Sequence, residues 1–542
     1  MKALDIMSAI ELELPLLPRR PVAPARLRQP LPSTEQLLVT GGDARITLDP
    51  RSAANQYGCR PFPDPQLLAF GSSTASVISA AGFAAAERLR HRLFFNAGSK
   101  ARAVTYADEL ERVRRELLHL CAVSDLPGLE LVFAASGTDL HLIAAQLTAS
   151  GARRPTRVIM IDAAETGGCV PAALAGRHFS SRVALGEAVT EGTVINGGAT
   201  IDLVSVAIRD SAGDARPSAD VDAEVEALVT AAVALGQRVL LILVDVSKTG
   251  LLAPSPMCVS TLRQRFAERI DVLVDACQFR MAPSTVRAYL EHGFMLALTG
   301  SKFVTGPTFA GALLLPAAMA SRLRRQPFPR ALRDYSTQAD WPKTWATADI
   351  LDQAANYGLL LRWEAALHEL RSLRAVPEAK VTRFLHAFAT AVQQRLRNDP
   401  CFAPLPVPAI DRRPLLDANS WDQIQTIFPF LLHHPDRATG KSVLSTAQTQ
   451  AVYRLLQTDL SRHPDLARSG LAEDKAALRC QIGQPVLCGS RDGVAMSALR
   501  LCTSARLVVA ATAPDAMGSA AVIAQALAVL DKTAGLIRTA CA

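Results

Sequence analysis

The sequence predicts an α/β protein that has a large, mainly parallel sheet domain flanked by helices and a smaller C-terminal α+β domain. Two observations lead to this fold class. Between about residues 129 and 298, short runs rich in Val, Ile and Leu alternate with helical or loop segments, which is typical of parallel strands covered on both faces. Several of these runs lead directly into polar residues, as strands do at the carboxyl edge of an open α/β sheet, where ligands bind.

The individual strands are predicted from apolar runs of strand length. These runs cover residues 129–134, 157–161, 201–207, 239–244, 271–274 and 294–298. Helical periodicity dominates the segments before and after them, at about 75–122 and 346–397.

The chain is expected to divide into an arm, two domains and a connection between them. The expected regions are an N-terminal arm, partly Pro-rich, over residues 1–70, a large domain over 71–320, a linker helix region over 321–364, and a small domain over 365–542. The prolines between residues 14 and 34 predict an irregular conformation for that part of the arm.

The composition is that of a globular chain with an ample core. Of the 542 residues, 49% are hydrophobic and 20% are charged, and the net charge of +8 is not clustered, so nucleic-acid binding is not expected. The ten Cys form no CxxC pair, so no metal site is expected, and they are typical of reduced thiols in a cytoplasmic protein. Neither a signal peptide nor a membrane-bound protein is expected, because apolar runs such as that at 239–244 are too short to span a bilayer.

An acid and a lysine follow the last two predicted strands. Asp275 directly follows the strand at 271–274, and Lys302 follows the strand at 294–298, so both can converge on one cleft. In pyridoxal phosphate (PLP) chemistry a Lys holds the cofactor aldehyde and an Asp keeps the pyridinium nitrogen protonated. Either residue alone is more often a solvated loop residue or a helix cap, but their joint placement predicts a PLP site.

The run Ser136-Gly137-Thr138-Asp139 lies where a predicted strand becomes a helix. The N–H groups and the dipole of a helix N-terminus bind anions, and Gly lets a phosphate approach closely. The alternative interpretation is an ordinary Ser or Thr helix cap. With Asp275 and Lys302 downstream, phosphate binding is the better interpretation.

In these motifs the chain resembles the PLP-dependent enzymes of fold type I, and more narrowly the class V aminotransferase and cysteine desulfurase group. The resemblance rests on Ser136-Gly137-Thr138-Asp139, on Asp275-Ala276-Cys277-Gln278, and on Ser301-Lys302 followed by Gly306-Pro307. It covers about residues 70–315 well and the C-terminal domain faintly. It implies the PLP-dependent transferase fold, an enzyme with PLP as cofactor, and a homodimer with shared active sites.

The resemblance also implies a role for each matching residue. Asp275 would pair with the pyridine nitrogen, Gln278 would contact the ring hydroxyl, and Lys302 would be the Schiff-base lysine that also moves protons. The phosphate would be held by Gly137, Thr138, Thr299 and Ser301, with Thr308 reaching it across the dimer interface.

The chain departs from the group at two positions beside the ring. Where many members stack a His on the ring, this chain has Thr166 or Glu165, and where many carry an Asn near the ring hydroxyl, Ser247 is the substitute. These departures do not change the expected cofactor, but they leave the type of reaction open.

An amino-acid substrate needs a group that binds its carboxylate, and Arg is the bidentate choice. Arg500 is the first candidate, because the group keeps its carboxylate-binding Arg near this point of the chain, and Arg479 is the reserve. The alternative for each is a surface Arg.

Aminotransferase-type chemistry on an amino acid or amine, through an external aldimine, is the first expectation for the reaction. The alternatives are a PLP-dependent lyase, acting by Cβ elimination, replacement or C–S cleavage, a decarboxylase, and a catalytically silent PLP-fold binding protein. Ile482 occupies the position of the nucleophilic Cys of one desulfurase branch, which argues against persulfide chemistry.

Overall fold

The structure is a computed structural model of the chain and describes residues 31–71, 76–96, 101–417, 420–435, 442–462 and 471–539. The prediction of an irregular Pro-rich arm falls mostly on residues 14–30, which lie outside the described residues.

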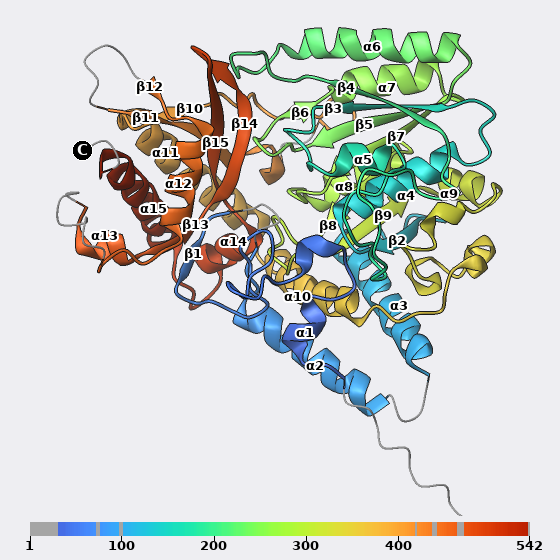
Figure 1. Ribbon diagram of the computed structural model, residues 1–542, viewed down its shortest axis with the longest axis horizontal. Helices are drawn as coiled ribbons and strands as arrows, with labels where there is room; N and C mark the ends of the chain where they lie inside the picture. Colours follow the sequence, from blue (N-terminus) through green and yellow to red (C-terminus); the bar gives the residue numbers. More distant parts are fainter. Residues whose placement is uncertain are drawn as a thin grey trace, which may run out of the picture.

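An eight-stranded sheet forms the centre of the large domain (Figure 1). Its main strands lie in the order β2-β9-β8-β7-β5-β3-β4, and β6 pairs with β5. Strands β4, β3, β5, β7 and β8 pair in parallel, whereas β9 runs antiparallel to both of its neighbours. The bounds are β2 Glu130–Ala134, β3 Thr156–Ile161, β4 Ile201–Val206, β5 Val239–Asp245, β6 Leu252–Ala253, β7 Ile270–Ala276, β8 Met295–Thr299 and β9 Gly311–Leu315.

The predicted fold class is confirmed, and each predicted strand of the large domain is present with its ends shifted by no more than a residue or two. The prediction missed β9, because its apolar run is short and begins with Gly311 and Ala312, which have low strand propensity. Every residue of β9 is buried between β2 and β8, so its neighbours in the sheet supply the stability that its sequence lacks.

Helices pack on this sheet and beside it. Helix α4 contacts β2, β3, β8 and β9, whereas α6 and α7 lie side by side and contact β3, β4, β5 and β7 (Figure 1). The helices of this part are α2 Ala80–Asn96, α3 Arg102–Leu120, α4 Gly137–Ala149, α5 Val170–Leu174, α6 Ser218–Ala234, α7 Pro256–Arg265, α8 Pro283–Glu291, α9 Ala317–Arg324 and α10 Tyr357–Arg374.

The C-terminal part is an α+β unit, as predicted. Strands β10, β11, β15 and β14 form an antiparallel sheet in that order, β12 pairs with β11, and β13 pairs in parallel with β1. The strand bounds are β1 Leu67–Ala69, β10 Phe402–Pro404, β11 Ile427–His434, β12 Ser442–Val443, β13 Arg479–Gln481, β14 Gly483–Arg491 and β15 Val494–Cys502. Its helices are α11 Glu378–Asn398, α12 Thr446–Leu456, α13 Glu473–Ala477, α14 Ala505–Thr512 and α15 Ser519–Thr539.

Among the described residues, one helical segment has the length and composition needed to cross a membrane, namely Ser519–Arg538 of α15. Core helices of globular proteins share these properties. In α15, 56% of the most apolar window is buried inside the protein, where the helix packs against α11, α12 and α14.

The N-terminal segment is packed onto the large domain rather than extended away from it. Helix α1 (Thr34–Leu38) lies against α10 and α2. The fully buried Arg362 of α10 donates hydrogen bonds to the carbonyls of Leu38, Thr40, Gly41 and Phe309. Because α10 runs unbroken from Tyr357 to Arg374, the boundary predicted between residues 364 and 365 falls inside a helix that packs against α2 and α3.

We expect Arg362→Met to lower the free energy of unfolding by about 3 kcal/mol, because it leaves buried carbonyls without a donor. Urea unfolding measures the change. Arg383→Met is the matched control, since Arg383 lies on the exposed face of α11. Equal, small effects of both substitutions would show that Arg362 does not hold the N-terminal segment in place.

Candidate active site

A cavity of about 260 Å³ lies at the carboxyl edge of β7 and β8. The first turn of α4, the residues after β3 and β5, the loop after β8, and parts of β14 and β15 form its walls. Most of the predicted site residues line it, namely Gly137, Thr138, Thr166, Asp275, Gln278, Thr299, Ser301, Lys302 and Arg500.

The first turn of α4 closes tightly on the neighbouring strand ends. The Ser136 side chain caps the helix by accepting a hydrogen bond from the Asp139 N–H at 3.3 Å. A Cβ on Gly137 would lie 2.9 Å from Cys277 Sγ and 3.1 Å from Thr299 Cγ2, so a larger residue would push the turn away from the sheet. Gly137 thus brings the anion-binding end of α4 directly to the cavity.

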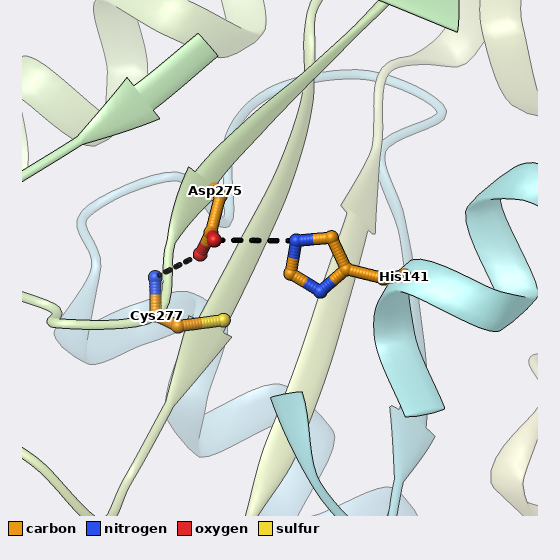
Figure 2. A group of neighbouring side chains, drawn as sticks. All are labelled: His141, Asp275 and Cys277. Carbon is orange, nitrogen blue, oxygen red and sulfur yellow. Dashed lines mark hydrogen bonds and ion pairs between the residues drawn. The ribbon is translucent and has the colours of Figure 1, made fainter. Parts of the chain in front are cut away.

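Asp275, at the end of β7, forms a buried ion pair with His141 of α4 (Figure 2). His141 Nε2 lies 3.2 Å from Asp275 Oδ2, and the Cys277 N–H donates to Asp275 Oδ1 at 3.1 Å. Burial alone would raise the pKa of Asp275, but His141 and Lys302 together hold it well below its usual range. The carboxylate is therefore ionised, and Asp275 lines the cavity.

The other ring nitrogen of His141 is fixed by its own helix. His141 Nδ1 lies 2.7 Å from the Gly137 carbonyl oxygen and can donate to it. Nε2 then attracts the carboxylate only when it also carries a proton. His141, Asp275 and Cys277 offer three metal-ligand atoms within 4.8 Å of one another. Burial and Asp275 raise the pKa of the Cys277 thiol well above its usual value, which opposes the thiolate form that a metal binds.

The loop after β8 presents Lys302 to the same cavity. Thr299 Oγ1 donates to the Cys277 carbonyl at 2.6 Å, which ties the ends of β7 and β8 together. The Gly300 N–H donates to the Ala310 carbonyl at 2.8 Å, and the Gly306 N–H donates to the Gly300 carbonyl at 2.8 Å. These hydrogen bonds fold the loop back on itself and hold Lys302 beside Asp275.

Arg500, on β15, reaches the cavity from the small domain. Its guanidinium donates to two main-chain carbonyls, those of Lys248 at 3.3 Å and Gln484 at 2.6 Å. Its Nε is buried without a hydrogen-bond partner in the described part of the chain. Arg500 is therefore positioned by neutral groups and retains its charge for an anion in the cavity.

Three predicted site residues are not brought into the cavity. Ser247 Oγ donates to Glu165 Oε2 at 2.8 Å, so Glu165 rather than a cofactor binds its hydroxyl. Thr308 is buried and accepts from Asn55 Nδ2 at 3.2 Å within the same chain, and its expected contact with the phosphate of a second subunit stays a prediction. Arg479 forms a two-point ion pair with Asp64. Sequence spacing could not reveal these partners, because they come from distant segments.

The structure adds residues to the site that the sequence did not indicate. Arg45 donates to Thr138 Oγ1 at 3.2 Å and pairs with Asp43 at 2.6 Å, which places an N-terminal guanidinium at the first turn of α4. Lys248 also lines the cavity. His141 had a possible signal, since it lies one helical turn after Gly137, whereas nothing in the local sequence around Arg45 distinguishes it.

No protein-family model matches the chain, and no curated protein matches its sequence. Solved structures do resemble its fold. The cysteine desulfurase CsdA from Escherichia coli is 16% identical with a TM-score of 0.47, over 86% of this chain and 94% of that one. Serine palmitoyltransferase from Sphingomonas wittichii is 10% identical with a TM-score of 0.46, over 86% and 87%. Ureidoglycine-glyoxylate aminotransferase from Bacillus subtilis is 10% identical with a TM-score of 0.45, over 87% and 94%.

The residues that line the cavity fit PLP. The amides at the start of α4 suit a phosphate, Asp275 suits a pyridinium nitrogen, and Lys302 suits an aldehyde. Thr166 Oγ1 is buried and has no hydrogen-bond partner within the described residues, so the cavity holds a polar atom that a bound ring hydroxyl could satisfy.

We expect His141→Leu to lower the free energy of unfolding at pH 7 by about 3 kcal/mol, because it leaves the buried Asp275 carboxylate without its partner. Since the folded pKa of Asp275 is depressed, the stabilisation is fully present above the unfolded pKa of about 4 and is lost progressively as the pH falls from there toward the folded pKa. The difference in the free energy of unfolding between wild type and variant should therefore become smaller as the pH is lowered.

Urea unfolding between pH 7 and pH 3 measures this difference. His386→Leu is the control, because His386 is exposed on α11. A His141→Leu deficit that stays constant across this pH range would mean that the lost contact is packing rather than the ion pair.

Proposed function

We propose that this protein is a PLP-dependent enzyme that acts on an amino acid. The observation that carries the proposal is the convergence of Asp275, Lys302 and the first turn of α4 on one cavity. When bound, PLP draws electrons from the Cα of an attached amino acid, which allows a bond at that carbon to break.

The predicted residues that line the cavity have defined tasks in this proposal. The ionised Asp275, held in place by His141, keeps a proton on the ring nitrogen. Lys302 holds the cofactor aldehyde and moves a proton at Cα. The amides of Gly137 and Thr138, with Ser301, bind the phosphate, and Arg500 orients the substrate by its carboxylate.

Transamination is the reaction that we favour within this class. Persulfide transfer needs an exposed, activated thiolate. Cys169 and Cys277 line the cavity, but burial raises the pKa of both thiols. Ile482, Cys480 and Cys488 are buried. Transamination needs no thiol, only a lysine that moves a proton at Cα.

The decisive experiment is reconstitution of the protein with PLP. The wild type should turn yellow, and borohydride should fix the cofactor to Lys302, which peptide mass spectrometry identifies. Lys302→Ala should lose the yellow band and the borohydride adduct and nearly all turnover. A Lys302→Ala variant that keeps both the colour and full activity would refute the proposal.

The products formed from each proteinogenic amino acid then identify the reaction. Transamination should release a 2-oxo acid and leave the amine form of the cofactor. Release of ammonia with pyruvate would instead indicate elimination, and carbon dioxide would indicate decarboxylation. A coloured protein that converts none of the amino acids would favour a binding role.

Arg500 and Arg479 form a matched pair for testing the carboxylate site. An ammonium cannot reproduce the bidentate guanidinium fork. Arg500→Lys should therefore lower kcat/KM, mainly by raising KM, by a factor that corresponds to about 2–4 kcal/mol of lost stabilisation. Arg479→Lys should be silent, since Arg479 is paired with Asp64 outside the cavity. PLP binding should be unchanged in both variants. If Arg500→Lys leaves kcat/KM unchanged, Arg500 does not bind the substrate.

A further inference from the structure

Lys248 is a second cation on the substrate side of the cavity, and the tasks described above do not use it. It lies in the loop between β5 and β6, and its side chain lines the same cavity as Arg500 and Lys302. Its Nζ donates to the carbonyls of Ala163 at 3.4 Å and Ala164 at 3.1 Å. These neutral groups orient the ammonium group but do not neutralise it.

The nearby acidic groups do not neutralise it either. Glu165 is the nearest in sequence to those carbonyls, but Arg209, Ser247 and Thr249 already bind its carboxylate at 2.6–2.8 Å. Asp162 attracts Lys248 more weakly than the neighbouring cations repel it. Burial, together with Arg500 and Lys302, lowers the pKa of Lys248 to about 8. A buried cation held among other cations is stabilised by an incoming anion.

Among the described residues that line the cavity, Asp275 is the one carboxylate, and it faces His141. Arg45 is paired with Asp43. Arg500 and Lys248 are therefore the cations that remain for a substrate. They are also adjacent, because the Arg500 guanidinium donates to the main-chain carbonyl of Lys248 itself.

We propose that the substrate is an amino acid with an acidic side chain, in which Arg500 binds the α-carboxylate and Lys248 binds the side-chain carboxylate. This inference rests on the proposed function, since it assigns the substrate class of the same site. A dicarboxylic amino acid offers each of the two cations a carboxylate of its own, whereas a monocarboxylic one has only one carboxylate for both.

The test compares acids with their amides, which have nearly the same size and shape. The PLP-loaded wild type is titrated with aspartate, asparagine, glutamate and glutamine, and the change in the cofactor absorbance gives a dissociation constant for each. One acid should bind at least about 30-fold more tightly than its amide, the scale expected for a buried charge pair. If both amides bind as tightly as their acids, or more tightly, the inference is wrong, and no result with a variant changes that.

Lys248→Gln then assigns the preference to this residue. The variant should lose most of the acid-over-amide preference while it binds the amides as the wild type does. Lys248→Arg, which keeps the charge, should retain the preference, and Lys380→Gln, on the exposed face of α11, should change nothing.

The outcomes distinguish the inference from the proposed function. If Lys248→Gln weakens acids and amides by the same factor, both cations bind one carboxylate and the inference is wrong, although the PLP enzyme stands. If the wild type takes up no PLP and never turns yellow, the proposed function itself fails, and this inference fails with it.

Discussion

The parallel alignment of β5, β7 and β8 is the constraint on which the site depends. In this register Val244 lies beside Asp275, and Asp275 lies beside Ala297 on β8. Strands that run in the same direction end at the same edge of the sheet. The polar residues that follow each of these strands therefore lie close together. The antiparallel β9 begins at that edge, where Phe309 just before it lines the cavity, and it runs back through the sheet between β2 and β8.

The strands and the residues that follow them could be predicted from the sequence, because both depend on local sequence pattern. Apolar runs located the strands of the large domain, and the polar residues after them located Asp275, Lys302 and the first turn of α4. Strand β9 was missed because its stability comes from its neighbours rather than from its own composition. Ser247 and Thr308 were assigned to the site from the family resemblance and Arg479 as a possible carboxylate-binding Arg, and their partners Glu165, Asn55 and Asp64 lie far away in the sequence.

His141 and Arg45 illustrate two different reasons why a site residue escapes sequence analysis. His141 lies two residues after the predicted motif, but its role became visible only when α4 was placed beside β7. Arg45 belongs to a segment that was expected to be an arm, and only tertiary packing brings it to Thr138. Both residues act on groups that the sequence did identify, so the missed residues support the predicted ones rather than replacing them.

The docking of the N-terminal segment has a consequence for where the large domain begins. Arg362 fixes the backbone from Leu38 to Gly41, and the residues that follow carry Arg45 and Tyr57 to the cavity wall. A chain shortened to start at residue 61 would retain every strand of the central sheet and yet have an open side to its cavity. In this protein the sheet and the enclosure around its ligand are therefore encoded by different stretches of sequence.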